Sequence, residues 1–214
     1  EESLEYFAKQ NTHVTGNPVR KYFLKDKTFE SLPKITISAS KCILVFGGSQ
    51  GADFINTFFQ KHYDYFLSEG YCLIHITGTR YYQKHYSDQA YQDIQKKDVS
   101  GRILVYPYFE NMDYLYQQCQ YVVSRAGATT IAELLHYKKQ AFLIPFPFAK
   151  DNHQELNAKA FVRDGNGQYK QQNDLNIQHI QDWLDKQNSK TKISPSLDEN
   201  ARLIIVKKIE ALLK

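Results

Sequence analysis

Short apolar runs alternate with longer mixed segments along most of this chain. Five apolar runs are predicted to be strands, at residues 42–46, 71–76, 102–105, 121–123 and 141–144. Apolar positions at helical spacing predict the helices between them. One of these helices ends near residue 67, and the others cover residues 82–97, 112–119, 130–137 and 152–163. Two further helices are predicted in the tail, around residues 189–196.

The strands are nearly continuous apolar runs, which is typical of burial on both faces of a sheet. Strands that alternate with helices of ten or more residues favour a parallel sheet covered by helices on both sides. The predicted fold class is therefore α/β, a Rossmann-like, doubly wound parallel sheet. In such sheets ligands bind beyond the carboxyl ends of the strands.

The length of 214 residues and the hydrophobic content of 42% suit one domain with a sizeable core. We expect residues 1–40 to be a lead-in or interdomain linker and residues 41–214 to form the domain, with helices at its C-terminal end. The chain begins without Met, inside helix-like residues, so we expect it to be part of a longer protein. It contains no visible signal peptide and no run near the roughly 18 apolar residues that cross a bilayer.

Charge and cysteine usage exclude several classes of site. The net charge of +4 comes from scattered basic residues, so no nucleic-acid groove is expected. Cys42 and Cys72 lie in apolar runs and are predicted to be buried, reduced thiols. No Cys or His spacing is typical of a zinc site, so no metal is expected.

The first candidate loop is Gly47-Gly-Ser-Gln-Gly-Ala52, between a strand and a helix. Glycines allow a tight turn and close backbone approach, and a helix N-terminus attracts phosphate. A tight turn without a ligand explains the glycines equally well. The Gly-Lys-Ser/Thr ending of a P-loop is missing, and the next strand ends His75-Ile-Thr-Gly78 without the acid that holds a nicotinamide cofactor's ribose.

The second candidate loop is Ser124-Arg-Ala-Gly-Ala-Thr-Thr-Ile-Ala-Glu133. Thr130 and Glu133 are three residues apart and fit a capping box, in which each side chain accepts a bond from the other's backbone. Alternatively, the backbone of residues 128–130 donates to phosphate and Glu133 accepts from ribose hydroxyls. Two glycine-hinged helix starts at one sheet edge favour the second interpretation.

The third candidate segment is Pro145-Phe-Pro-Phe-Ala-Lys-Asp-Asn-His-Gln-Glu-Leu-Asn157. Its hydrogen-bonding side chains at a helix start suit the recognition of sugar hydroxyls. Taken singly, Asp151 is most simply an N-cap and His153 a surface histidine.

Together these motifs resemble the C-terminal domain of the MurG family of glycosyltransferases. The matching segments, in the same order and spacing, are Gly16-Asn-Pro-Val-Arg20, Gly47–Ala52, Ser124–Glu133 and Asp151-Asn-His-Gln154. The resemblance covers roughly residues 12–167. It implies the C-terminal half of a GT-B fold, two Rossmann-like domains facing across a cleft, in which residues 41–214 bind UDP-N-acetylglucosamine.

The resemblance also implies roles for single residues around the diphosphate. Arg20 and Ser49 would contact it, and Gln50 would lie beside it. The backbone facing phosphate would belong to Ala128, Thr129 and Thr130.

The remaining implied contacts are to the nucleoside and the sugar. Glu133 would bind the uridine ribose, and the backbone of Phe109 would pair with uracil. His153 and Gln154 would hold the sugar hydroxyls.

In this family the enzyme is a hexosyltransferase of peptidoglycan synthesis, peripheral on the cytoplasmic face of the bacterial inner membrane. The 4-hydroxyl of a lipid-linked N-acetylmuramyl-pentapeptide displaces UDP with inversion. Helix dipoles and Arg20 would stabilise the departing diphosphate without a metal or other cofactor. No catalytic residue is assigned here, because the base and the acceptor loop belong to the family's N-terminal domain. We expect this chain alone to bind the donor and transfer nothing.

Two alternatives stay open on the sequence. The chain could be a stand-alone UDP-sugar-binding subunit that needs a separate acceptor and membrane subunit. A dinucleotide-dependent oxidoreductase is the more distant alternative. Calorimetry with UDP, UDP-N-acetylglucosamine and NADH would test the oxidoreductase. The gene immediately upstream would separate a fragment, which continues the reading frame, from a stand-alone subunit, which follows a stop codon.

Overall fold

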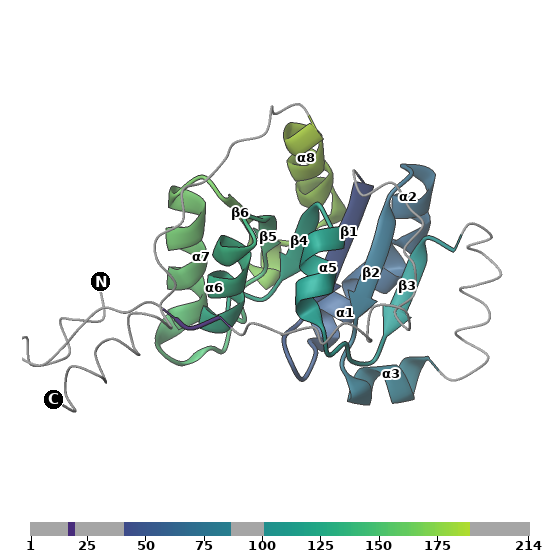
Figure 1. Cartoon of the computed structure of the whole chain (residues 1–214), viewed down its shortest axis with the longest axis horizontal. Coiled ribbons are helices and arrows are strands. Elements are labelled where there is room, and N and C mark those ends of the chain that lie inside the picture. Colours follow the sequence, from purple (N-terminus) through teal and green to yellow (C-terminus); the bar gives the residue numbers. More distant parts are fainter. Residues whose placement is uncertain (1–16, 20–40, 87–100, 189–214) are drawn as a thin grey trace, which may run out of the picture.

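The computed structural model describes residues 17–19, 41–86 and 101–188 of the chain, and its centre is a parallel sheet of six strands (Figure 1). The strands are β1 Cys42–Phe46, β2 Cys72–Ile76, β3 Ile103–Tyr106, β4 Tyr121–Ser124, β5 Gln140–Leu143 and β6 Gly167–Tyr169. Their order across the sheet is β3-β2-β1-β4-β5-β6. All five pairings are parallel, which confirms the predicted α/β, Rossmann-like class.

The order of the strands reverses direction at β1. The chain moves from β1 outward through β2 to β3, then returns to place β4 on the other side of β1, with Phe46 opposite Ser124. Loops that follow β1 and β4 therefore leave neighbouring strands at the same edge. This is the switch point at which ligands bind in open parallel sheets.

Two apolar cores cover the two faces of the sheet. In β1, Ile43 and Val45 enter one core, and Cys42, Leu44 and Phe46 enter the other. The first core is closed by α1 Asp53–Lys61, α2 Tyr63–Ser68, α3 Thr79–His85 and α8 Ile177–Asn188. The second is closed by α5 Met112–Gln118, α6 Ala128–His136 and α7 His153–Arg163. Figure 1 shows these two groups of helices on opposite sides of the strands.

Element boundaries depart from the prediction in four places. A helix was expected over residues 82–97, but α3 begins at Thr79 and ends at His85, and residues 87–100 lie outside the described residues. One helix was expected before residue 67, but the chain breaks at His62 into α1 and α2. The edge strand β6 was not predicted. Short 3-10 turns, η4 Lys150–Asn152 and η5 Gln172–Asp174, precede α7 and α8. The predicted domain limits and the last helix of the tail lie partly or wholly outside the described residues and stay predictions.

The described residues contain no helix that is long and apolar enough to cross a membrane. All three cysteines of the chain, Cys42, Cys72 and Cys119, are buried thiols outside any disulfide, as predicted for the first two.

Candidate functional site

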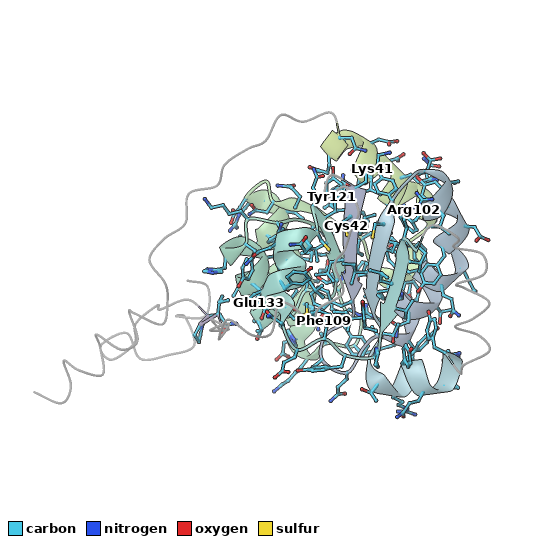
Figure 2. The ribbon with its side chains drawn as sticks, turned by 45° about the vertical axis from the view of Figure 1, so that its right-hand side comes forward. Lys41, Cys42, Arg102, Phe109, Tyr121 and Glu133 are labelled. Carbon is cyan, nitrogen blue, oxygen red and sulfur yellow. The ribbon has the colours of Figure 1, made fainter. Side chains whose placement is uncertain are left out.

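Most of the predicted site residues follow strand ends at the carboxyl edge of the sheet. Figure 2 shows Phe109 and Glu133 at this end, while Lys41 and Arg102 lie at the opposite end. The elements that reach this edge are the segments after β1, β3, β4 and β5.

The loop after β1 is a tight turn. The backbone N–H of Gly51 donates to the carbonyl oxygen of Gly48 over 3.0 Å, and both residues have positive φ angles, 80° and 98°. Such angles favour glycine because they bring a Cβ too close to the backbone. Ser49 and Gln50 are exposed at the tip of this turn, as a ligand contact there would require.

A buried polar network holds the end of β2 beneath this turn. The Asn56 side-chain amide donates to the carbonyl oxygen of Thr77 over 2.7 Å, and its Oδ1 lies 3.1 Å from Nε2 of His75. Nδ1 of His75 lies 2.6 Å from the hydroxyl oxygen of Tyr63, which also lies 3.0 Å from that of Tyr86. Complete burial lowers the pKa of His75 to about 3, so this network contains a neutral imidazole.

The loop after β4 leads directly into α6. The helix begins at Ala128 with Gly127 as its N-cap, and Ala128 and Thr129 are exposed. The first N–H groups of a helix have no partner within it, so they can donate to an anion. A capping box would require Thr130 to be the N-cap of this helix. That interpretation is wrong, because Gly127 is the N-cap, Thr130 lies inside the helix, and the N-cap residue makes no side-chain hydrogen bond.

Glu133 is half-buried on α6 and accepts a hydrogen bond from another helix. The hydroxyl of Tyr116, on α5, donates to its Oε2 over 2.9 Å. The carboxylate is thus oriented by a side chain of another helix. A half-buried, oriented carboxylate suits the recognition of neighbouring hydroxyl groups.

Arg125 was not predicted as a site residue. It is 7% exposed, and its guanidinium donates to the carbonyl oxygens of Ile144 and Pro145, each over 3.0 Å, and to Oε1 of Gln172 over 2.6 Å. Burial lowers its pKa to about 10, which leaves it charged at neutral pH. It ties the loop after β4 to the end of β5. The only sequence signal was a charged residue directly after a buried strand.

The segment after β5 brings the predicted sugar-contacting residues to the start of α7. His153 is exposed, with Nδ1 2.7 Å from the carbonyl oxygen of Lys150. Gln154 accepts from the backbone N–H of Phe146 over 3.0 Å. The N-cap prediction for Asp151 is wrong. Asn152 occupies that position, and both residues have a left-handed backbone.

The remaining predicted residues are Phe109 and Arg20. Phe109 is 9% exposed and packs edge-on against Tyr106, with ring centroids 5.4 Å apart, between β3 and α5. Its backbone therefore has a fixed position at the same edge. Arg20 lies outside the described residues, and its contact with the diphosphate stays a prediction.

Comparison with known proteins identifies the family. Residues 42–211 match the model of the glycosyltransferase family 28 C-terminal domain. A relative from Halothermothrix orenii, named UDP-N-acetylglucosamine–N-acetylmuramyl-(pentapeptide) pyrophosphoryl-undecaprenol N-acetylglucosamine transferase, is 37% identical over 74% of this chain and 43% of its own length. A Bacillus cytotoxicus protein of the same name is 33% identical over 87% of this chain and 50% of its own length. The chain thus spans about half the length of these curated relatives.

Solved structures agree with this family. MurG of Acinetobacter baumannii is 25% identical with a TM-score of 0.57, over 70% of this chain and 41% of that one. The glycotransferase of kitacinnamycin, 16% identical with a TM-score of 0.56 over 70% of this chain and 35% of that one, shares the fold. With more than half of its residues inside the family model, this chain belongs to the glycosyltransferase family 28 C-terminal domains.

Proposed function

We propose that this domain binds UDP-N-acetylglucosamine as the donor half of an inverting glycosyltransferase of peptidoglycan synthesis. The acceptor would be a lipid-linked N-acetylmuramyl-pentapeptide, as in the names of the relatives. The whole enzyme would act at the cytoplasmic face of the membrane. The observation that carries the proposal is the pairing of the α6 N-terminus with the oriented carboxylate of Glu133 at the switch point of the sheet.

The two features suit the two parts of a nucleoside diphosphate. The exposed start of α6 offers N–H donors and positive dipole character to phosphate oxygens. Glu133 lies on the same helix, one to two turns further on, and offers acceptors to the ribose hydroxyls. Ser49 and Gln50, from the loop after the adjacent strand, complete the diphosphate side.

The sugar would lie toward the segment after β5. His153 and Gln154 begin the helix that packs beside α6, so they suit contacts with sugar hydroxyls. Because Gln154 Oε1 accepts from the loop backbone, its amide N–H groups are the ones that would donate to a sugar oxygen.

In the proposed reaction the bond between the anomeric carbon and the UDP oxygen breaks as the acceptor's 4-hydroxyl oxygen bonds to that carbon from the opposite side. The electron pair of the broken bond stays on UDP, where the α6 N-terminus and Arg20 would stabilise it without a metal. The hydroxyl proton passes to a base that we expect on the acceptor-binding domain.

Calorimetry on the 214-residue chain tests donor binding. We expect UDP and UDP-N-acetylglucosamine to bind and NADH not to bind. Glu133→Gln keeps an acceptor oxygen for Tyr116 but removes the charge, and hydrogen bonds to a charged group are roughly twice as strong as neutral ones. We expect a loss of UDP affinity of about five- to tenfold, near 1 kcal/mol, with the melting temperature maintained. Binding of NADH without binding of UDP would overturn the proposal.

A further inference from the structure

The contact between Tyr116 and Glu133 joins two helices across 17 residues of sequence. Tyr116 belongs to α5 and is fully buried, and its hydroxyl reaches Oε2 of Glu133 on α6 over 2.9 Å. Phe109, in the segment just before α5, lies at the same end of the molecule as Glu133 (Figure 2). Tyr116 therefore contacts, from another helix, the carboxylate to which the proposed function assigns the ribose.

The ring of Tyr116 is held rigidly. It stacks on Tyr137 with centroids 4.9 Å apart and planes 13° apart. Phe46, the last residue of β1, packs edge-on against it at 6.4 Å and 76°. Burial and close packing against these two rings restrict rotation of the Tyr116 ring, so its hydroxyl oxygen is held next to Glu133 on α6.

The hydroxyl also stays a donor. Burial, reinforced by the neighbouring carboxylate, raises the pKa of Tyr116 well above its ordinary value. A protonated hydroxyl beside a carboxylate donates to it, and a hydrogen bond to a charged acceptor is stronger than one to a neutral acceptor. Glu133 is thereby restrained in orientation before any ligand arrives.

We propose that Tyr116 is a positioning residue that orients Glu133 toward the ribose diol and so sets the domain's preference for ribonucleotide donors over deoxyribonucleotides. This inference rests on the proposed function, because it needs Glu133 to contact the ribose. A glutamate side chain left to rotate must be ordered on binding, which weakens affinity by about three- to tenfold. Tyr116 removes that loss in advance.

Tyr116→Phe tests the proposal, because it removes the hydroxyl and keeps a ring that can pack against Phe46 and Tyr137. The measurement is the dissociation constant of UDP and of 2′,3′-dideoxy-UDP, which lacks both hydroxyls. We expect UDP binding to weaken about fivefold and dideoxy-UDP binding to stay unchanged, so the preference for the ribonucleotide narrows. The proposal would be overturned if the ratio of the two dissociation constants stayed equal to that of the wild type. This includes the case in which UDP and dideoxy-UDP lose affinity equally.

Tyr121→Phe is a matched control. The Tyr121 hydroxyl donates to Oδ1 of Asn188 over 2.9 Å, and Figure 2 shows Tyr121 at the end of the sheet opposite Glu133. Both variants lose one tyrosine hydroxyl bonded to a side-chain oxygen. We expect Tyr121→Phe to lower the melting temperature and to leave both dissociation constants unchanged. A narrowed preference in this variant would overturn a local role for Tyr116.

A double-mutant cycle separates a local effect of Tyr116 on Glu133 from a general effect of the substitution on the fold. In a Glu133→Ala background the change Tyr116→Phe should have no further effect on the ratio of the two dissociation constants, because Tyr116 acts through Glu133. A further effect there would overturn the proposal. If the wild-type chain binds UDP no better than dideoxy-UDP, the ribose role of Glu133 fails first. If the wild type discriminates and Tyr116→Phe does so equally well, only the role of Tyr116 fails.

Discussion

The loops after β1 and β4 leave neighbouring strands at one edge of the sheet, and both place glycine between a buried strand and a helix. In the first loop, internal packing requires glycine. A Cβ on Gly51 would overlap the carbonyl oxygen of Thr77, and a Cβ on Gly47 would overlap the side chain of Ala52. In the second, Gly127 has an ordinary φ of −67°, and a Cβ there would meet only the Thr130 hydroxyl oxygen, at 3.9 Å.

This difference changes what each glycine indicates. The first loop needs glycine to fold at all, so its glycines alone do not point to a ligand. The backbone and the space around Gly127 would accept alanine, so packing within the loop does not require glycine there. We therefore expect the second loop, more than the first, to be sensitive to a ligand at the start of α6.

Gly51→Ala should break the first loop. Its φ of 80° and the overlap with Thr77 predict a loss of about 4 kcal/mol in the free energy of unfolding, measured by urea titration. Gly48→Ala is the control, because Gly48 has a similar φ of 98° with open space around it, so only about 1 kcal/mol should be lost. Equal losses for the two variants would show that strain, and not packing on Thr77, dominates.

Acidification should weaken the network beneath the first loop. His75 has a folded-state pKa of about 3 against 6.5 for an ordinary histidine, so the unfolded chain takes up a proton that the folded chain refuses. The contribution of neutral His75 to the free energy of unfolding is complete above pH 6.5 and is lost as the pH falls toward 3. We expect this term to remove up to about 3 kcal/mol between pH 6.5 and pH 4.

Urea titrations of the wild type and of His75→Gln across this pH range isolate that term. The variant should be less stable at pH 7 and should lose less stability on acidification. If the stabilities of the wild type and of His75→Gln fell in parallel with pH, the acid sensitivity would belong to groups other than His75.

Gly127→Ala should have the smallest effect on stability and the clearest effect on binding. The free energy of unfolding should fall by less than about 1 kcal/mol, because the backbone and the space both admit a methyl group and only the preference of an N-cap for glycine over alanine is lost. UDP affinity should fall several-fold when that methyl group lies at the phosphate-facing start of α6. If calorimetry showed the same UDP affinity for Gly127→Ala and the wild type, the glycine of the second loop would no more indicate a ligand than the glycines of the first.

The fold was largely predictable because its strands are buried on both faces. Burial makes β1, β2 and β4 continuous apolar runs, and these runs were located to within a residue or two. The strand β6 escaped prediction because it is a short edge strand, Gly-Gln-Tyr, without an apolar run. The break at His62 was also missed, since apolar spacing continues across it from α1 into α2.

The site was predictable only as far as its residues are local in sequence. The motif around Gly127 located the start of α6 to within two residues, but local spacing suggested a capping partner for Glu133 that the helix register excludes. Its observed partner, Tyr116, lies on another helix, and no local pattern connects the two. Arg125 was missed for the same reason, because its acceptors belong to β5 and to η5.

The buried thiols can be used to measure how often the sheet opens to solvent. Cys42 and Cys72 lie side by side on β1 and β2, and Sγ of Cys119 is 3.4 Å from that of Cys42. The hydrogen bond with Cys119 and burial raise the pKa of Cys42, so an alkylating reagent meets little Cys42 thiolate in the folded protein. Reaction at Cys42 and Cys72 therefore requires β1 and β2 to become exposed to solvent. The rate at which mass is added to these two cysteines reports how often the middle of the sheet is exposed.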